Sequence, residues 1–383
     1  MGREVVAVTM SPIFIFGTLC HQPLLDLVAG EPQQMERAAL PGYRAAWVKG
    51  GSWPMLEKRD GMVAEGALIA PSPEALARLD YYEACFAYTR RKLNVIREGS
   101  EVEAEAWFPP SGQGQEPGED WSLSDWAAHW GALQVVAASE VMRQMGKVSP
   151  EVIGARFSII RARADAYVRS GRWRRPGHVG AQMPSDKVVH HGTTHAYDGF
   201  FNAEEVQASH PRFDGGTNGP LRRSVFRVAD AVTLIPYDPV RDRIMLVQQF
   251  RFGAYAHGDA NPWLLEPIAG MIDAGETPEV AARREAREEA KLDLGALHFV
   301  ARYYPSPGGL AQVLFSYLGI ADLPDEAAGV GGHVAENEDI LSHIIPYDLA
   351  RRMLVEGDMA DAAQIVTMQY LMLHRDRLRA QAG

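Results

Sequence analysis

Residues 270–292 read GMIDAGETPEVAARREAREEAKL, and this stretch decides the fold of the C-terminal half of the chain. Thr277 suits the N-cap of a helix, because its hydroxyl can accept a hydrogen bond from the first turn. Pro278 then suits the first helical position, and Glu279 is favoured near the positive end of the helix dipole. The residues that follow are rich in Ala and charge. The stretch therefore predicts a helix that begins at the proline and runs through at least Ala290.

Three glutamates lie on one face of this predicted helix. Glu285, Glu288 and Glu289 are spaced i, i+3 and i+4, so their carboxylates lie close together and repel one another. Two arrangements relieve this repulsion, namely a solvated acidic face with nearby arginines or a bound divalent cation. Mg²⁺ prefers carboxylate oxygens and keeps waters for a phosphate-bearing substrate. The glutamates by themselves leave both arrangements open.

The wider stretch resembles the Nudix box. The pattern of this motif is Gly-x5-Glu-x7-Arg-Glu-(apolar)-x-Glu-Glu-x-Gly-(apolar), where x is any residue. The positions in register are Gly270, Glu276, Arg284, Glu285, Ala286, Glu288, Glu289 and Leu292. Lys291 stands where the family has a glycine that ends the helix at positive φ, and a lysine there either costs about 1 kcal/mol or is absorbed by a shifted helix end. The resemblance implies a Nudix α/β/α sandwich.

From about residue 188 to the C-terminus the chain resembles bacterial ADP-ribose pyrophosphatases. The segments that carry this resemblance are residues 199–201 (GFF), 248–251 (QQFR), 263–266 (WLLE), 306–309 (SPGG) and 336–339 (ENED). In that family the segment that matches 199–201 stacks on adenine, and those that match 248–251 and 263–266 line the diphosphate site. The segment that matches 306–309 marks ADP-sugar hydrolases, and the one that matches 336–339 supplies the catalytic base. Gln312 stands where the family has a Ser/Thr-Glu pair, which leaves the identity of the nucleotide sugar open.

The resemblance also implies roles for individual residues. The ligands that it implies for Mg²⁺ or Mn²⁺ are Glu285, Glu288, Glu289 and the carbonyl of Ala269. The residues that it places against the substrate are Phe200, Arg223, Arg251, Glu266, Gly308 and Gln312. Glu336 would orient or deprotonate the attacking water, with Glu338 as the alternative, and Arg284 would hold the glutamates by ion pairing. The implied reaction is hydrolysis of the diphosphate bond of ADP-ribose or a related nucleoside diphosphate sugar, giving AMP and ribose 5-phosphate, in a homodimer.

The N-terminal half has the pattern of a compact α+β domain. The apolar runs that predict strands are residues 13–16, 45–48 and 62–68. Residues 73–80 predict a helix that Ser72 caps. Helical composition returns after a Pro- and Gly-rich loop and persists to about residue 170. We therefore expect an N-terminal domain at 1–118, a helical connector at 119–187 and the Nudix domain at 188–383.

Two segments of the N-terminal half resemble γ-glutamylcyclotransferase-like (AIG2-like) domains, which implies a mixed β-barrel. Residues 14–19 (FIFGTL) resemble the family's strand and loop, whose amides bind a substrate carboxylate, although Phe16 replaces a tyrosine. Residues 79–83 (LDYYE) resemble the segment with the catalytic glutamate, so Glu83 is the matching position, and Ala84 follows it where Gly is usual. The pairing of this domain with a Nudix domain resembles the tellurite-resistance (TrgB-type) proteins.

Composition narrows the class of protein. The 383 residues carry a net charge of −11, which disfavours a nucleic-acid partner because neutralising phosphates needs surplus Lys and Arg. The two cysteines, Cys20 and Cys85, are too few for a disulfide framework or a four-cysteine zinc site. The longest uncharged run, residues 5–25, contains Pro, Gly and polar residues and does not read as a membrane span. We expect a cytoplasmic enzyme without a membrane partner.

The sequence is consistent with three different functions. The leading one is a Mg²⁺-dependent nucleoside-diphosphate-sugar hydrolase. The second is a γ-glutamyl cyclotransferase that releases 5-oxoproline, and it gains support if Glu83 is buried in a pocket beside residues 17–19. The third is a sensor that binds ADP-ribose without cutting it, and this function predicts lost box carboxylates, whereas all three are present.

Overall fold

A computed structural model describes residues 11–110, 115–173, 178–180, 183, 185–332 and 338–382. The chain divides into two compact units, 1–164 and 165–383, and the boundary falls within one helix, α6 (Phe157–Arg172). Our expected domain bounds at 118 and 187 are a different division, and they remain predictions. Each unit is described separately below.

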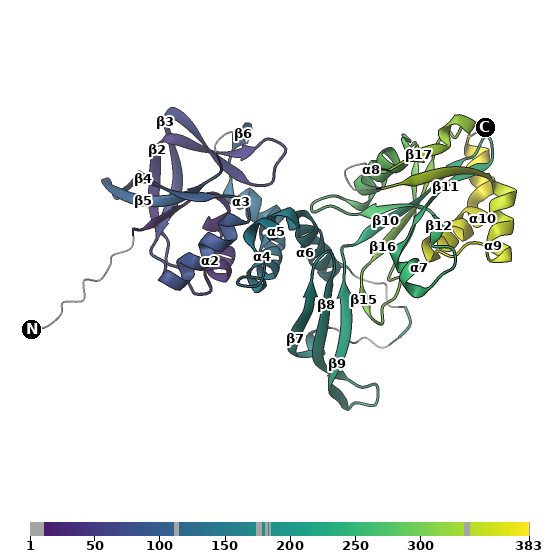
Figure 1. The fold of residues 1–383 in the computed structure, drawn as a ribbon, viewed down its shortest axis with the longest axis horizontal. Coiled ribbons are helices and arrows are strands. Elements are labelled where there is room, and N and C mark those ends of the chain that lie inside the picture. Colours follow the sequence, from purple (N-terminus) through teal and green to yellow (C-terminus); the bar gives the residue numbers. More distant parts are fainter. Residues whose placement is uncertain are drawn as a thin grey trace, which may run out of the picture. The chain divides into compact units, whose positions relative to one another are not determined.

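The first unit is built on a small barrel (Figure 1). Its strands are β1 (Ile13–Ile15), β2 (Glu36–Val48), β3 (Pro54–Ile69), β4 (Thr89–Arg97), β5 (Ser100–Phe108) and β6 (Pro117–Asp120). The order is β3-β1-β5-β4-β2, and β2 pairs again with β3, so five strands close on themselves while β6 adds to β2 from outside. Only the β1–β5 pair is parallel among these described strands. The mixed barrel expected from the sequence is confirmed.

Apolar residues on the inner positions of these strands form the barrel core. The fully or nearly fully buried members are Phe14, Ala38, Leu40, Ala64, Leu68, Val95, Ala104 and Ala106. Burying such side chains gains about 25 cal/mol per Å² of apolar surface, so this interior holds the strands in register. The predicted strands at 45–48 and 62–68 fall within β2 and β3, and the one at 13–16 matches β1 except for Phe16, which precedes the 3₁₀ turn.

Helices complete the first unit. They are α1 (Gln22–Ala29), α2 (Pro73–Ala84), α3 (Leu123–Trp126), α4 (Ala132–Arg143), α5 (Pro150–Ala155) and the first part of α6, with a 3₁₀ turn η1 (Gly17–Cys20) and a π-helical turn η2 (Ala127–Gly131). The hydroxyl of Ser72 accepts the amide N–H of Ala75 at 3.2 Å and so caps α2 as predicted. The expected helical stretch after residue 118 is confirmed, and its α4 packs on α1 and α2.

The second unit contains an eight-stranded sheet. Its strands are β10 (Ala231–Asp238), β11 (Arg243–Phe250), β12 (Trp263–Glu266), β13 (Ile268–Met271), β14 (Leu297–Tyr303), β16 (Leu314–Ile320), β17 (Gly329–Gly331) and β18 (Ile340–Pro346). The main order is β14-β16-β10-β11-β18-β17, with β12 paired to β11 and β13 to β10. Its helices are α7 (Phe252–His257), α8 (Pro278–Ala290), α9 (Tyr347–Glu356) and α10 (Ala362–Ala382), with a 3₁₀ turn η4 (Asp325–Ala327).

The central strands are buried on both faces, which explains their continuous apolar runs. Along β10, Val232 and Leu234 face the layer that contains α8, whereas Ile235 and Tyr237 face the layer that contains α9 and α10. Figure 1 shows α8 on one side of the sheet and α9 and α10 on the other. The Nudix α/β/α sandwich is confirmed, and the C-terminal helix packs on this core through Met368 as expected.

A second, separate sheet of four strands belongs to the same unit. Its strands are β7 (Val189–Asp198), β8 (Asn202–Pro211), β9 (Thr217–Arg227) and the short β15 (Leu310–Ala311), in the order β15-β9-β8-β7 and after a 3₁₀ turn η3 (Ser185–Lys187). Because β15 lies between the box helix and β16 in sequence, it ties this sheet to the segment that follows the box.

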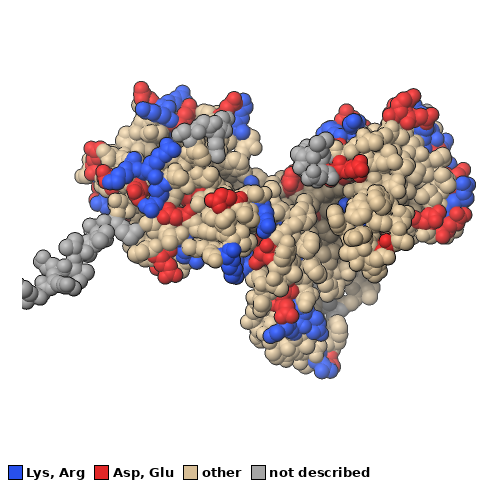
Figure 2. Space-filling model, in the orientation of Figure 1, with Lys and Arg blue, Asp and Glu red and all other residues tan. Residues whose placement is uncertain are grey.

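Two surface features complete the description. No described helix combines the length and the apolarity that crossing a bilayer requires. On the face shown in Figure 2, Lys and Arg side chains lie among Asp and Glu side chains rather than in a continuous basic band.

Candidate active sites

The box helix α8 forms as its capping signals predict. The hydroxyl of Thr277 accepts the amide N–H of Val280 at 3.3 Å, Pro278 occupies the first helical position and the helix ends at Ala290. Lys291 follows in the left-handed conformation with φ 55°, at the position where positive φ was expected. The helix therefore keeps the family's geometry at this end, and the lysine takes on the strain that a glycine would avoid.

Arg284 joins the helix to the preceding loop and strand. Its guanidinium donates to Glu276 at 2.9 and 3.1 Å, to Glu285 at 2.7 Å and to Glu288 at 3.0 Å. It also donates to the carbonyl of Met271 at 2.9 Å, at the end of β13. Hydrogen bonds to Glu276 and the nearby carboxylates raise the pKa of Arg284. The ion pairs predicted for this arginine are present, and they hold three carboxylates around one cation.

Glu285 and Glu289 are buried, unlike Glu288. Burial raises the pKa of Glu285 to about 7, although the charge of Arg284 opposes this rise. Burial, followed by repulsion from Glu285 and Glu338, raises the pKa of Glu289 to about 9. The Oε2 atom of Glu289 is buried and has no hydrogen-bond partner. This part of the site therefore holds one carboxylate oxygen, Oε2 of Glu289, that the described protein atoms alone do not satisfy.

The strand beside the helix leaves room for these carboxyl groups. Gly270 lies on β13, and a Cβ atom added there would overlap the carboxylate of Glu285. Its neighbour Ala269 pairs with Thr233 of β10, and its backbone contributes a hydrogen bond to Glu289. A glycine at this position is thus required by the close approach of a side chain, not by backbone torsion.

The donor set has the chemistry that a divalent cation takes. Hard cations prefer carboxylate and carbonyl oxygens, and the unpartnered oxygen of Glu289 lies in a group of mutually repelling carboxyls. As the described side chains lie, no three His, Cys, Asp or Glu residues form a ready metal cluster. The carboxylate of Glu285 accepts a hydrogen bond from the guanidinium of Arg284 at 2.7 Å. The residues fit a cation by chemistry, and the predicted ligand set remains a prediction.

Two predicted substrate residues are paired with each other near the corner between β13 and α8. Arg251 donates to Glu266 at 2.6 Å, and burial raises the pKa of Glu266 despite that contact. The charge of Arg251 also acts on Glu289, as does that of Glu338. Glu336 lies outside the described residues. The structure therefore brings Arg251 and Glu338 into the electrostatic surroundings of Glu289, and Glu266 is the partner of Arg251.

The other predicted substrate residues gather at the separate sheet. Phe200 lies at the turn between β7 and β8 and is 57% exposed, so it is not a core residue. Arg223 lies exposed on β9 and donates to the carbonyl of Arg222 at 2.8 Å. Gly308 precedes β15 and has open space where a Cβ would lie, whereas Gln312 donates to the carbonyl of Ala229 at 2.9 Å. All four residues therefore lie on strands of this sheet or on the segments next to them.

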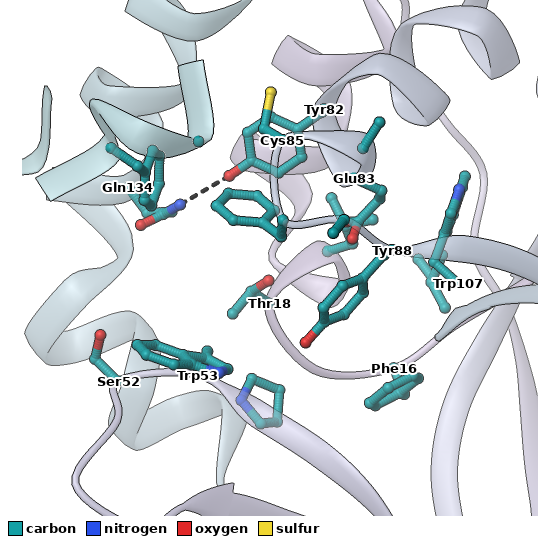
Figure 3. Close-up of a pocket in the computed structure, with 18 of the residues that line it drawn as sticks. Phe16, Thr18, Ser52, Trp53, Tyr82, Glu83, Cys85, Tyr88, Trp107 and Gln134 are labelled. Atoms are coloured by element: carbon teal, nitrogen blue, oxygen red, sulfur yellow. Dashed lines mark hydrogen bonds between the residues drawn. The ribbon is translucent and has the colours of Figure 1, made fainter. Parts of the chain in front are cut away.

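The first unit contains a cavity of about 550 Å³ around the second candidate residue. Glu83, at the end of α2, lines it together with Thr18 and Leu19 of η1 (Figure 3). The side chain is only 9% exposed, and burial, with repulsion from Asp80, raises the pKa of Glu83 to about 8. The condition set from the sequence, a glutamate buried in a pocket beside residues 17–19, is met.

Polar groups that face this cavity are left without protein partners. No described residue donates a hydrogen bond to the Glu83 carboxyl, and the hydroxyl of Tyr88 is likewise unbonded to any described residue. In Figure 3 the Tyr88 hydroxyl points into the cavity, into the space between Thr18 and Phe16. Across the cavity, Gln134 donates to the hydroxyl of Tyr82 at 2.7 Å. The sequence did not single out Tyr88 or Gln134, because neither belongs to a motif.

Comparisons with known proteins agree with this division. A family model described as "Gamma-glutamyl cyclotransferase, AIG2-like" matches residues 13–128, and one described as "NUDIX domain" matches residues 227–359. The chain therefore belongs to the Nudix family and carries an AIG2-like domain ahead of its Nudix domain.

Within that family its relatives are pyrophosphatases of nucleoside diphosphate sugars. The "ADP-ribose pyrophosphatase" of Escherichia coli (strain K12) is 38% identical over 183 residues, 48% of this chain and 87% of the relative. That of Haemophilus influenzae is 36% identical over 185 residues, 48% of this chain and 85% of the relative. A "GDP-mannose pyrophosphatase" of Salmonella paratyphi B is 32% identical over 151 residues, 39% of this chain and 77% of the relative. The Nudix half is thus of the ADP-ribose pyrophosphatase type.

Proposed function

We propose that the Nudix domain hydrolyses the diphosphate bond of ADP-ribose or a related nucleoside diphosphate sugar, giving AMP and ribose 5-phosphate when the substrate is ADP-ribose. The names of the relatives support this substrate class. The observation that carries the proposal is the corner between β13 and α8. There Arg284 holds Glu276, Glu285 and Glu288, and the buried Glu289 keeps one carboxylate oxygen without a partner.

In this reaction a water oxygen bonds to one phosphorus and the bridging P–O bond breaks, so negative charge builds on the leaving phosphate oxygen. Mg²⁺ or Mn²⁺ held by Glu285, Glu288, Glu289 and the carbonyl of Ala269 would neutralise that charge. Arg284 positions the carboxylates. Glu336, or Glu338 as the alternative, would accept the proton of the attacking water.

The substrate would extend from this corner to the separate sheet. Arg251 would exchange its contact with Glu266 for a phosphate oxygen, because a planar guanidinium suits two oxygens at once. The exposed ring of Phe200 would stack on adenine, and Arg223, Gly308 and Gln312 would contact the rest of the nucleotide. We expect a homodimer, which light scattering on the full chain would test.

The test is a hydrolysis panel of nucleoside diphosphate sugars in Mg²⁺, with AMP release as the readout. Glu289→Gln removes one carboxylate charge, and we expect AMP release to fall about 100- to 1,000-fold, the usual effect of losing one group that stabilises transition-state charge. The matched control is Glu279→Gln, an exposed position on the same helix. AMP release that survives Glu289→Gln unchanged contradicts the metal assignment, and binding of ADP-ribose without any hydrolysis favours the sensor.

A second function, in the first unit, is favoured by the burial of Glu83. γ-Glutamyl cyclisation forms a bond between the α-amino nitrogen and the γ-carbonyl carbon and breaks the amide bond, which releases 5-oxoproline and an amine. Glu83 would take the proton from the amino group and pass it to the departing nitrogen. A carboxyl group with a pKa near 8 is suited to exchange protons near neutral pH.

Release of 5-oxoproline from γ-glutamyl amides tests this second function. We expect the wild-type chain to release it and Glu83→Gln to abolish the release. Glu74→Gln, an exposed position on the same helix, is the matched control. If neither protein releases 5-oxoproline from any γ-glutamyl amide, Glu83 has no such role.

A further inference from the structure

Residues 165–173, the end of α6 and the residue after it, belong to the second unit. They lie ahead of residues 227–359, the part of the chain that the Nudix family model matches. We call them the connector end. Their contacts lead to both ends of residues 304–313, which we call the substrate segment because it contains two residues proposed above to contact the nucleotide, Gly308 and Gln312. The connector end thus lies outside the matched residues but is bonded to them.

Stacked rings hold the first residue of the substrate segment. The ring of Trp173 stacks on that of Tyr304, with centroids 5.4 Å apart and planes inclined by 28°. The guanidinium carbon of Arg302, near the end of β14, lies 4.0 Å from the Trp173 ring centroid and 5.9 Å from that of Phe315. Ring stacking and cation–π contacts both favour particular geometries. Trp173 therefore restricts the place at which the substrate segment leaves β14.

A buried carboxylate holds the last residue of the substrate segment. Asp230, directly before β10, is only 5% exposed. Its Oδ1 atom accepts the amide N–H of Val313 at 3.0 Å, and its Oδ2 atom accepts Arg169 of the connector end at 3.0 Å. Arg169 is also paired with Asp165, one helix turn earlier. A buried carboxylate is stable when a cation and hydrogen-bond donors surround it, so Arg169 supports the group that holds Val313.

Asp230 also connects the substrate segment to the Nudix box. Its backbone carbonyl accepts the amide N–H of Ile272 at 3.0 Å, directly after β13. The neighbouring carbonyl of Ala229 accepts the side chain of Gln312 at 2.9 Å. The placement of Gln312 relative to the box therefore depends on Asp230, and the placement of Asp230 depends in turn on Arg169.

A third contact acts on the strand that pairs with the middle of the substrate segment. The amide N–H of Phe226, on β9, donates to the carbonyl of Gly309 at 2.8 Å. The next residue of β9, Arg227, has its guanidinium carbon 5.6 Å from the ring centroid of Tyr167 in the connector end. The connector end thus acts on the start, the middle and the end of one short segment.

We propose that the connector end positions the substrate segment for the nucleotide, with Arg169 acting through Asp230 and Trp173 acting through Tyr304. This inference rests on the proposed hydrolase function and names two positioning residues for it. The proposed metal ligands lie on α8 and β13, and the contacts described above do not include them. Loss of the connector contacts should therefore weaken substrate binding and leave the chemical step and the Mg²⁺ requirement in place.

Steady-state AMP release by the full-length chain, with the best substrate of the panel above, separates these effects. Arg169→Gln and Trp173→Leu should each raise KM about tenfold or more, because a small misplacement of binding groups is costly, while kcat stays within about twofold. The Mg²⁺ concentration for half-maximal rate should not change. A variant that is merely less stable loses active molecules instead, which lowers kcat and leaves KM unchanged.

Two further variants test the route through Asp230. Arg169→Lys keeps the charge and should restore most of the affinity. Asp230→Asn should raise KM by itself, and combining it with Arg169→Gln should raise KM no further, because both changes break the same link. The matched control is Arg172→Gln, an exposed position on the same helix, which should keep the wild-type KM. Thermal unfolding verifies that each variant is folded.

The proposal is overturned if KM is unchanged in both Arg169→Gln and Trp173→Leu, or if Arg172→Gln raises KM equally. Additive effects of Arg169→Gln and Asp230→Asn would also overturn it. If the wild type releases no AMP, the proposed hydrolysis is wrong, and calorimetric titration with ADP-ribose replaces KM. Binding that is about tenfold weaker in Arg169→Gln would then still support the positioning role. Equal binding would overturn that role, and a wild type that binds no ADP-ribose would overturn both.

Discussion

Replacing Glu83 by Gln should make the first unit more stable at alkaline pH while it abolishes 5-oxoproline release. The carboxyl group is 9% exposed and has no described hydrogen-bond donor, so ionising it in place is costly. Burial raises its pKa from 4.5 to about 8. At 1.36 kcal/mol per pKa unit, this difference of roughly 3.5 units corresponds to at most about 5 kcal/mol.

The direction follows from proton binding. Between pH 4.5 and 8 the folded state keeps a proton on Glu83 that the unfolded state has lost. The contribution of this group to stability is therefore complete below pH 4.5 and is lost as pH rises through 8. Glutamine does not titrate. The variant should match the wild type within about 1 kcal/mol at pH 4 and exceed it by up to about 5 kcal/mol at pH 9.

Urea denaturation followed by tryptophan fluorescence measures this difference at each pH. Six of the eight tryptophans lie between residues 47 and 130, so the signal reports mainly on the first unit. Glu74→Gln changes the same charge at an exposed position of α2 and should stay within about 0.5 kcal/mol of the wild type throughout. A Glu83→Gln variant that gains nothing between pH 4 and 9 would refute the burial argument.

Three further predictions concern the Nudix domain. Gly270→Ala places a Cβ against Glu285 and should lower AMP release at least about tenfold, whereas Gly192→Ala, with open space at its Cβ, should not. Lys291→Gly removes a side chain from a residue at φ 55° and should stabilise the protein by about 1 kcal/mol in thermal unfolding. Arg284→Lys keeps the charge but loses the guanidinium fork, so kcat for AMP release should fall about 10- to 100-fold with no loss of fold, and an unchanged kcat would exclude the positioning role.

Local signals in the sequence predicted the box helix almost completely. The cap at Thr277 and the start at Pro278 depend on neighbours within a few residues, which a single sequence contains. The sequence set only a minimum for the helix end, at Ala290, and for Lys291 it left open whether positive φ or a shifted helix end would follow. The pairing of Arg284 with Glu288 follows from i, i+4 spacing. Its bonds to Glu276, eight residues away, also agreed with the prediction, because the box fixes the turn between β13 and α8.

The cavity of the first unit could be predicted only in part. The motif around Glu83 indicated the residue, but its depth of burial depends on α4 and α6 folding over the barrel. Arg161 lies 78 residues further along the chain, on a helix that carries no motif. Nothing in its local sequence distinguishes it from Arg156, which lies five residues earlier, between α5 and α6, and outside the lining. Lining residues that belong to no motif can be identified only from the tertiary structure, because packing brings separate helices to one cavity.

Both sites contain buried glutamates with raised pKa values, yet their surroundings indicate different chemistry. Among the described residues, Asp80 is the one other carboxyl that acts on Glu83, so the cost of the Glu83 charge comes mainly from lost solvation, and a proton is enough to offset it. Glu289 has two further carboxyls acting on it, Glu285 and Glu338, so one proton would leave their repulsion in place. A divalent cation offsets all of these charges at once, whereas it would gain little at a single carboxyl. The number of carboxylates that act on each buried glutamate, rather than its pKa alone, is therefore our reason for proposing proton transfer at Glu83 and cation binding at Glu289.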